Sequence, residues 1–277
     1  MSYTGLQRVR SAATQLAGPT RFDAATWFER LALVAVGMTV LTFGMLNLDA
    51  RTIAGEPVWL KPVKFAASFV ILFATLAWVV HRLSRPWRSS WMLVSAAVFC
   101  SAAFCFEMAY ISAQAAQQKP SHFYQATPFH ALIYALMGTG ATVLMLSVAA
   151  VAVAIWLDPA PRMRSRLRLS VVLGFLLSIS LTFWIGEALV ENGGRYIGDP
   201  SVGGPRLPFL GWSMEVGDLR SAHFFALHAM QVLPVFGLLA ERLNLAARLV
   251  WIAALLYAGF AVTVFLKALQ GVPLVTA

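Results

Sequence analysis

Residues 128–157 read PFHALIYALMGTGATVLMLSVAAVAVAIWL and contain no Asp, Glu, Lys or Arg. A helix needs an apolar stretch of roughly 20 residues to cross the hydrocarbon core of a bilayer, and this stretch is longer. Six further apolar runs, at about 28–48, 60–80, 90–114, 168–190, 218–240 and 246–270, are also long enough. The sequence therefore predicts an all-α membrane protein, a bundle of seven transmembrane helices.

The composition of the whole chain excludes a soluble protein. Of 277 residues, 59% are apolar and only 12% are charged, and the mean hydropathy is +0.72. A soluble domain is about 45–50% apolar and about 25% charged. The net charge of +9 is spread between the apolar runs and forms no basic block, so we expect a lipid bilayer and no nucleic acid as partner. The two cysteines are too few for a disulfide framework.

The distribution of basic residues predicts the orientation in the membrane. Of the 21 Lys and Arg residues, 13 lie in the N-terminal segment and around the loops that follow spans two, four and six. Because cytoplasmic loops carry an excess of Lys and Arg, the N-terminus is expected inside and the C-terminus outside. The domains are then a leader (1–27), the membrane domain (28–270) and a short outer tail (271–277). The excess of Arg over Lys fits a bacterial protein, so we expect the bacterial cytoplasmic membrane.

One outer loop, 191–217, differs from the other connections. It contains seven glycines and three prolines together with Tyr196, Phe209 and Trp212. Long loops without regular structure are usually lids, binding loops or disordered segments, and the aromatic residues argue against plain disorder. We therefore expect this loop to be a lid or a binding loop.

Ionisable side chains inside the predicted spans mark candidate sites, because a charge at the centre of a spanning helix costs at least about 2.5–3.5 kcal/mol. Glu107, Tyr110 and Gln114 share one stripe of the third span, and Glu187 lies near the end of the fifth. Glu107 and Glu187 are the candidate catalytic acids. A structural hydrogen bond from Glu107 to a neighbouring helix is the simpler alternative.

The second span begins with two lysines, Lys61 and Lys64, on one helix face. Their position opposes both the charge bias of the loops and the helix dipole, whose positive end lies at this terminus. Glu107, Glu187 or an anionic ligand could compensate them. Alternatively, both lysines extend into the lipid headgroups.

The sixth span carries a broad polar face. Its members are Arg220, His223, His228 and Gln231. The two histidines are five residues apart, about 140° around the helix axis, so a straight helix cannot direct both to one ion.

Four histidines lie toward the outer side and suggest a bound metal. They are His122, His130, His223 and His228. With Glu107 or Glu187 nearby, they could hold haem or a divalent transition-metal ion, and His130 with one histidine of the sixth span is the expected haem-ligand pair. No HExxH, CxxCH, GxSxG or P-loop spacing occurs in the sequence, so no standard motif identifies the chemistry.

Three segments carry a resemblance to known sequences: KPVKFAAS (61–68), QAAQQKPSHF (114–123) and GWSMEVGDLRSAHFFALHAMQ (211–231). In combination they resemble a group of uncharacterised bacterial polytopic integral membrane proteins. The resemblance covers about residues 59–234. It implies a bacterial membrane protein and no particular activity, ligand or catalytic residue.

Three functions remain open from the sequence. The first is a cofactor-binding membrane protein that uses haem or a metal for redox chemistry or for metal-assisted chemistry on a lipid-like substrate. The second is a transporter or receptor for a small anionic ligand, bound by Lys61, Lys64 and Arg220, with Glu107 or His228 carrying protons. The third is an assembly or scaffold subunit whose polar groups form ion pairs between helices. The sequence does not decide whether the protein is an enzyme.

Overall fold

The computed structural model describes residues 22–201 and 203–277, and 70% of these residues are helical. Seven long apolar helices run through it: α2 (Ala24–Leu48), α3 (Leu60–Val80), α5 (Trp91–Ala116), α6 (Pro128–Leu157), α7 (Ser165–Glu191), α8 (Leu219–Arg242) and α9 (Arg248–Leu269). A short helix, α4 (Arg85–Arg88), precedes α5. Each long helix corresponds to one predicted span, so the prediction of seven helices long and apolar enough to cross a membrane is confirmed.

Helix α2 begins four residues before the predicted span of about 28–48. The side chain of Asp23 accepts a hydrogen bond from the backbone N–H of Ala25 and caps the helix at Ala24. Residues 24–27 of the predicted leader are therefore helical. Residues 1–21 of that leader lie outside the described residues.

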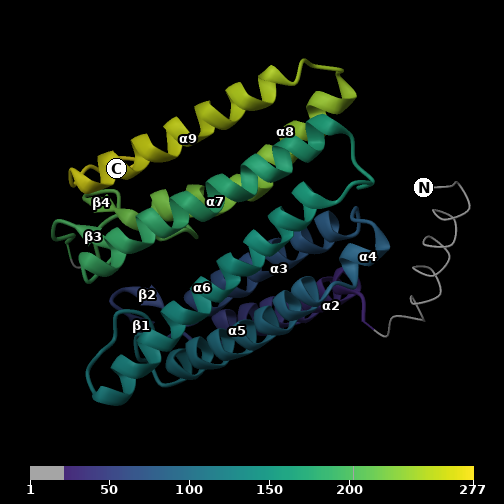
Figure 1. Ribbon diagram of the computed structural model, residues 1–277. Coiled ribbons are helices and arrows are strands. Elements are labelled where there is room, and N and C mark those ends of the chain that lie inside the picture. Colours follow the sequence, from purple (N-terminus) through teal and green to yellow (C-terminus); the bar gives the residue numbers. More distant parts are fainter. Residues whose placement is uncertain (1–21, 202) are drawn as a thin grey trace, which may run out of the picture.

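The long helices form two groups, which Figure 1 shows one above the other. Helices α2, α3, α5 and α6 form the first group, and α7, α8 and α9 form the second. The most extensive packing occurs between α7 and α8 and between α2 and α3.

Two glycines allow α7 and α8 to pack closely. A Cβ atom at Gly174 of α7 would lie 2.7 Å from the carbonyl oxygen of Ala229 in α8. A Cβ atom at Gly237 of α8 would collide with Ser170 Oγ of α7 and lie 2.6 Å from Ser170 Cβ. Small residues at such contacts let helix backbones approach each other within a membrane.

The apolar core divides along the length of the bundle. The larger core joins the first helix group to one half of α7, through residues such as Leu167 and Phe175. The other half of α7 contributes Leu181 and Ile185 to a separate core with α8 and α9. At one end of the bundle the two groups thus share a core, and at the other end the second group has a core of its own.

The end with the separate core carries two short antiparallel β-ribbons, and we call it the ribbon end. Strands β1 (Thr52–Ile53) and β2 (Glu56–Pro57) pair in the first ribbon, and β3 (Tyr196–Ile197) and β4 (Gly217–Asp218) pair in the second. The ribbon end comprises these strands and the loops 49–59, 117–127 and 192–218. These strands were not predicted from the sequence, because strands of two residues are too short to show an alternating pattern.

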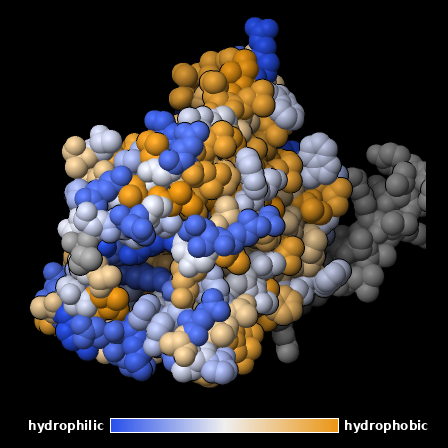
Figure 2. Space-filling model, turned by 90° about the vertical axis from the view of Figure 1, so that its left-hand side faces the viewer, coloured by the Kyte–Doolittle hydropathy of each residue, from blue (hydrophilic) through white to orange (hydrophobic). Residues whose placement is uncertain are grey.

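The surface differs between the sides of the bundle and the ribbon end. Large apolar side chains are exposed along the outermost helices, among them Leu33, Val40, Leu255 and Leu256, each about two-thirds exposed. Figure 2 faces the ribbon end, where hydrophilic residues gather around a hollow. Apolar sides with a polar end are the distribution expected of a multi-pass membrane protein.

Candidate functional site

The two predicted lysines lie in the first turns of α3, at the ribbon end. Lys61 Nζ lies 2.9 Å from Nδ1 of His122, in the loop after α5. Lys64 Nζ donates a hydrogen bond of 3.1 Å to the backbone carbonyl of Leu210. Within residues 22–201 and 203–277, neither lysine forms an ion pair with a carboxylate. Neutral groups therefore hold both ammonium ions.

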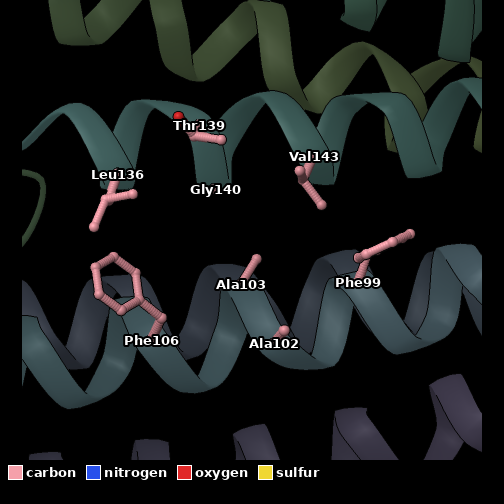
Figure 3. Close-up of a pocket in the computed structure, with 8 residues that line it drawn as sticks. All are labelled: Phe99, Ala102, Ala103, Phe106, Leu136, Thr139, Gly140 and Val143. Atoms are coloured by element: carbon pink, nitrogen blue, oxygen red, sulfur yellow. The ribbon is translucent and has the colours of Figure 1, made fainter.

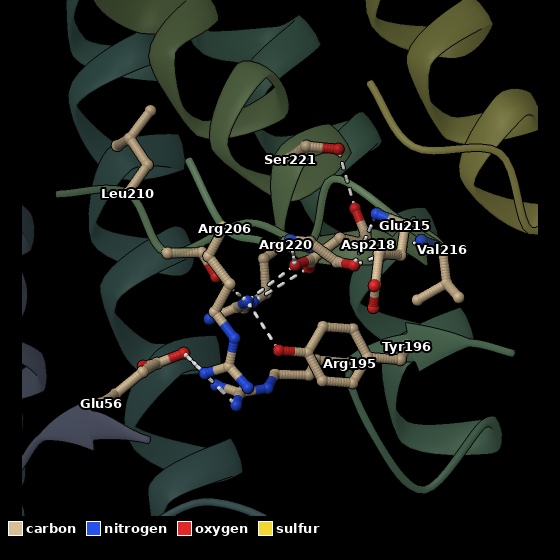
Figure 4. A network of polar contacts seen from close by, with 12 residues as sticks. Glu56, Arg195, Tyr196, Arg206, Leu210, Glu215, Val216, Asp218, Arg220 and Ser221 are labelled. Atoms are coloured by element: carbon tan, nitrogen blue, oxygen red, sulfur yellow. Dashed lines mark hydrogen bonds and ion pairs between the residues drawn. The ribbon is translucent and has the colours of Figure 1, made fainter. Parts of the chain in front are cut away.

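Two of the nearby carboxylates form ion pairs with arginines, as Figure 4 shows. Glu56 Oε1 lies 2.6 Å from Arg206 Nη1 and 3.5 Å from Arg195 Nη2. Arg220 donates to both carboxylate oxygens of Asp218, at 2.9 and 2.6 Å. Asp218 is only 2% exposed. Because charge-assisted pairs of this geometry are strong, both acids are held by arginines, and their charges act on Lys64 only from beyond ion-pair distance.

The loop 192–217 forms an ordered cover over these groups. The carbonyl of Leu210 accepts from Lys64, and that of Gly211 accepts from Arg220 at 2.6 Å. The side chain of Trp212 is buried against Phe224 of α8. Apart from Val202, the whole loop is described. The loop contributes to the site two backbone carbonyls and the side chains of Arg195 and Arg206, and its opening as a lid stays a prediction.

Glycine is favoured at position 211, in the centre of this cover. Its φ of +68° lies in the left-handed region that favours glycine. A Cβ atom there would lie 3.4 Å from Lys64 Nζ and 3.5 Å from Glu56 Oε1, in van der Waals contact with the charged groups. The backbone of the cover therefore lies directly against the charged groups at this position.

The ribbon end holds a cluster of five cationic side chains and three carboxylates, which we call the cationic cluster. Its members are Lys61, Lys64, Arg195, Arg206 and Arg220, with Glu56, Glu107 and Asp218. Burial and the charge of Arg220 lower the pKa of Arg195, while Glu56 opposes that effect. The excess of positive charge favours an anion in this region.

Glu107 lies in α5, 4% exposed, and its charge acts on Lys61. Its Oε2 atom has no hydrogen-bond partner in the described part of the chain. The hydroxyl of Tyr110, one turn further along α5, is likewise buried and without a partner there. Gln114 instead donates 2.8 Å to the carbonyl of Pro120. Within the predicted stripe, Glu107 and Tyr110 thus each have a buried oxygen without a hydrogen-bond partner among the described residues. The side chain of Gln114 instead binds the loop that follows α5.

The second predicted acid, Glu187, does not join the cluster. Its side chain is exposed on α7, and it forms no hydrogen bond or ion pair with any described residue. Glu187 therefore does not compensate the lysines.

The structure brings only two of the four candidate histidines together. His122 and His223 lie close enough for their charges to interact. His223 Nδ1 is buried and has no partner among the residues described. In contrast, His130 Nδ1 lies 2.7 Å from Thr127 Oγ1, and His228 Nδ1 lies 3.1 Å from Gln231 Oε1.

The hydrogen bonds of His130 and His228 to separate partners are relevant to the predicted metal or haem site. Gln231 also donates to Thr75 of α3, so His228 and Gln231 form a link between α8 and α3. In residues 22–201 and 203–277, no group of three or more His, Cys, Asp or Glu side chains is placed to hold a metal ion. The metal or haem stays a prediction from the sequence.

An apolar crevice of about 230 Å³ lies between α5 and α6, and none of its lining residues belongs to the cationic cluster. Figure 3 shows small residues, Ala102, Ala103 and Gly140, between larger ones such as Phe99 and Phe106. A Cβ atom at Gly140 would lie 3.3 Å from Glu107 Oε1. The crevice therefore lies directly beside the buried carboxyl group.

His122 gives the site a testable dependence on pH. Burial, the charge of Lys61 and the charge of His223 lower its pKa well below 6.5. Below pH 6.5 the unfolded chain thus binds a proton that the folded chain does not, so the free energy of unfolding decreases as the pH falls. The decrease attributable to His122 is up to about 1.4 kcal/mol per pH unit.

We expect His122→Gln to lose less stability than the wild type between pH 6.5 and 5.5, by about 1 kcal/mol. Chemical unfolding in detergent at the two pH values measures this difference. Between pH 8 and 7, where His122 is neutral in both states, the two proteins should change equally. An equal loss below pH 6.5 would contradict the argument.

Comparisons of the chain with models of protein families, with curated proteins and with solved structures find no match. The resemblance to bacterial membrane proteins stays an expectation, and the function has to be argued from the site.

Proposed function

We propose that this multi-pass membrane protein is a transporter that binds a small anion in the cationic cluster, with Lys61, Lys64 and Arg220 as the binding residues. The cluster lies at the end of the bundle where the two helix groups have separate cores. That arrangement leaves the polar groups between the helix groups, beneath the loop 192–217.

One observation carries the proposal: each lysine ammonium group has a neutral hydrogen-bond partner and no carboxylate within ion-pair distance. Lys61 has a histidine nitrogen and Lys64 a backbone carbonyl, while Glu56 and Asp218 are ion-paired with arginines. Ions in a low-dielectric region need compensation, because their desolvation costs several kcal/mol each. Glu107 acts on Lys61 from beyond ion-pair distance, so an anion between Lys61 and Lys64 would supply a closer counter-charge. Arg220, already bonded to Asp218, would add to the field and fix the cover.

The proposal includes the location and orientation of the protein. We place it in the cytoplasmic membrane of a bacterium, with the N-terminus inside and the ribbon end outside. The arginine-rich loops 82–88 and 162–168 lie at the end opposite the ribbons, as the positive-inside rule requires. The anion would then bind from the outer side.

Anion binding can be measured directly on the detergent-purified protein. Isothermal titration with chloride, nitrate, sulfate, phosphate, acetate and succinate should identify at least one anion that binds the wild type. We expect Lys61→Gln/Lys64→Gln to bind that anion at least about 100-fold more weakly, because each charged hydrogen bond contributes about 1.5–3 kcal/mol. Uptake of the same anion into proteoliposomes then tests transport.

Lys267→Gln is the control for surface charge. Lys267 is exposed in the last turn of α9, at the same end of the bundle, so its replacement removes one of the two charge units that the double variant loses and should leave binding intact. Binding of no anion in the panel, or equal binding by the double variant, would refute the proposal. Binding without uptake would indicate a receptor instead.

The prediction of a metal or haem is tested on the same preparation. Elemental mass spectrometry of wild type and of a variant lacking His122, His130, His223 and His228 compares their metal content. Near-stoichiometric iron, zinc or copper that disappears in the variant would favour the cofactor over the anion.

A further inference from the structure

We propose that Glu107 and the bound anion compete for the positive charge of Lys61, so that each anion that binds brings one proton from water to Glu107. This inference rests on the proposed anion site. It adds coupling between the anion and a proton to that site.

The surroundings of Glu107 allow its carboxyl group to be either protonated or ionised. The residue is 4% exposed, and its carboxyl group lies beside Gly140 of α6, which has no side chain. In residues 22–201 and 203–277 no donor reaches Oε2. A buried carboxylate without donors is costly, whereas a protonated carboxyl group loses that cost. The ionised form therefore depends on a nearby positive charge.

Lys61 is the charged group that acts on Glu107. The charged groups that act on Lys61 besides Glu107 are Arg195, Arg220 and Lys64. The further titratable groups around this pair are Tyr110 of α5, with Tyr124 beside it, and His122 of the following loop, with His223 of α8 beside it. Helix α6 contributes Gly140 and no charge at this contact. His122 has a lowered pKa and accepts the hydrogen bond from Lys61, so it stays neutral near neutral pH.

The competition follows from this arrangement. Without an anion, Lys61 compensates the carboxylate of Glu107. With an anion between the lysines, the positive charge of Lys61 is shared and a second negative charge lies near Glu107. The carboxylate then takes up one proton from the solvent: an O–H bond forms on Glu107, one O–H bond breaks in a hydronium ion, and a water molecule is released. By reciprocity, protonation of Glu107 must strengthen anion binding.

The test compares the pH dependence of anion affinity in wild type and Glu107→Gln. The probe is whichever anion of the panel binds the wild type most tightly, and its own titration cancels in the ratio of the two dissociation constants. As the pH rises, the affinity of the wild type for the anion should fall relative to that of Glu107→Gln. The fall should reach up to about tenfold per pH unit over the range where Glu107 loses its proton. Glu187→Gln, which removes an exposed acid on α7, should follow the wild type.

A second measurement does not depend on the folding of Glu107→Gln. Infrared difference spectra of the wild type and of Glu187→Gln should gain the carbonyl band of a protonated carboxyl group when the anion is added. Binding at every pH with a constant ratio and no such band would overturn the inference and leave the anion site intact. Absence of binding by every anion would instead refute the proposed function.

Discussion

Gly237→Ala should lower the free energy of unfolding by about 3 kcal/mol, near the upper end of the usual cost of overpacking. The new Cβ atom would collide with Ser170 Oγ, and it would lie 3.3 Å from the backbone Cα of Leu167. Because Leu167 and Ser170 are themselves buried, the conflict cannot be relieved by turning a side chain toward lipid. Helices α7 and α8 would have to separate. Thermal and chemical unfolding in detergent measure the loss.

Two other glycines provide controls for this prediction. Gly186 of α7 and Gly259 of α9 have no atom within 4 Å of a Cβ position. Gly186→Ala and Gly259→Ala should be neutral or slightly stabilising, since alanine in a helix is favoured over glycine by about 0.5–1 kcal/mol. Equal stability of Gly237→Ala and these controls would show that α7 and α8 pack less closely than described.

Arg220→Ala should destabilise the protein by about 3–5 kcal/mol, the usual cost of breaking a buried ion pair. Its guanidinium holds Asp218, which is 2% exposed, and the carbonyl of Gly211. Loss of both contacts leaves a buried carboxylate without its counter-ion and frees one attachment of the loop 192–217. Trypsin cleavage after Arg206, in that loop, should therefore accelerate.

A double variant separates the buried charge from the other effects. In Arg220→Ala/Asp218→Asn no uncompensated carboxylate remains, so more than half of the lost stability should return. The side-chain contact of Arg220 with Gly211 stays absent, so the cleavage after Arg206 should remain faster than in wild type. A double variant no more stable than Arg220→Ala would mean that Asp218 is not the source of the loss.

Hydrophobicity along the sequence predicted the seven long apolar helices. The seven apolar runs and the seven helices agree because a spanning helix has to satisfy its backbone internally, so length and composition alone define it. The β-ribbons were not predicted, since strands of two residues such as Tyr196–Ile197 depend on a partner far along the chain. Helix grouping and the divided core also depend on contacts that periodicity does not encode.

The candidate site was predicted only in part, for a related reason. Helical spacing placed Lys61 and Lys64 on one face, and the structure has both in the first turns of α3. The pairing of Glu56 with Arg206 joins residues 150 positions apart and was not predicted. The charged residues of the Gly- and Pro-rich loop, Arg195 and Arg206, were the available signal. Nothing in the sequence indicated that Lys64 would bind a backbone carbonyl.

That carbonyl contact has a consequence for how the family of this protein will vary. Every residue has a carbonyl group, so position 210 can change during evolution without loss of the contact to Lys64. Position 211 should change less freely, because its φ of +68° favours glycine. Distant relatives should therefore preserve the length of the loop and this one glycine while its other side chains diverge. Conserved spacing, rather than overall identity, is the signature by which to recognise them.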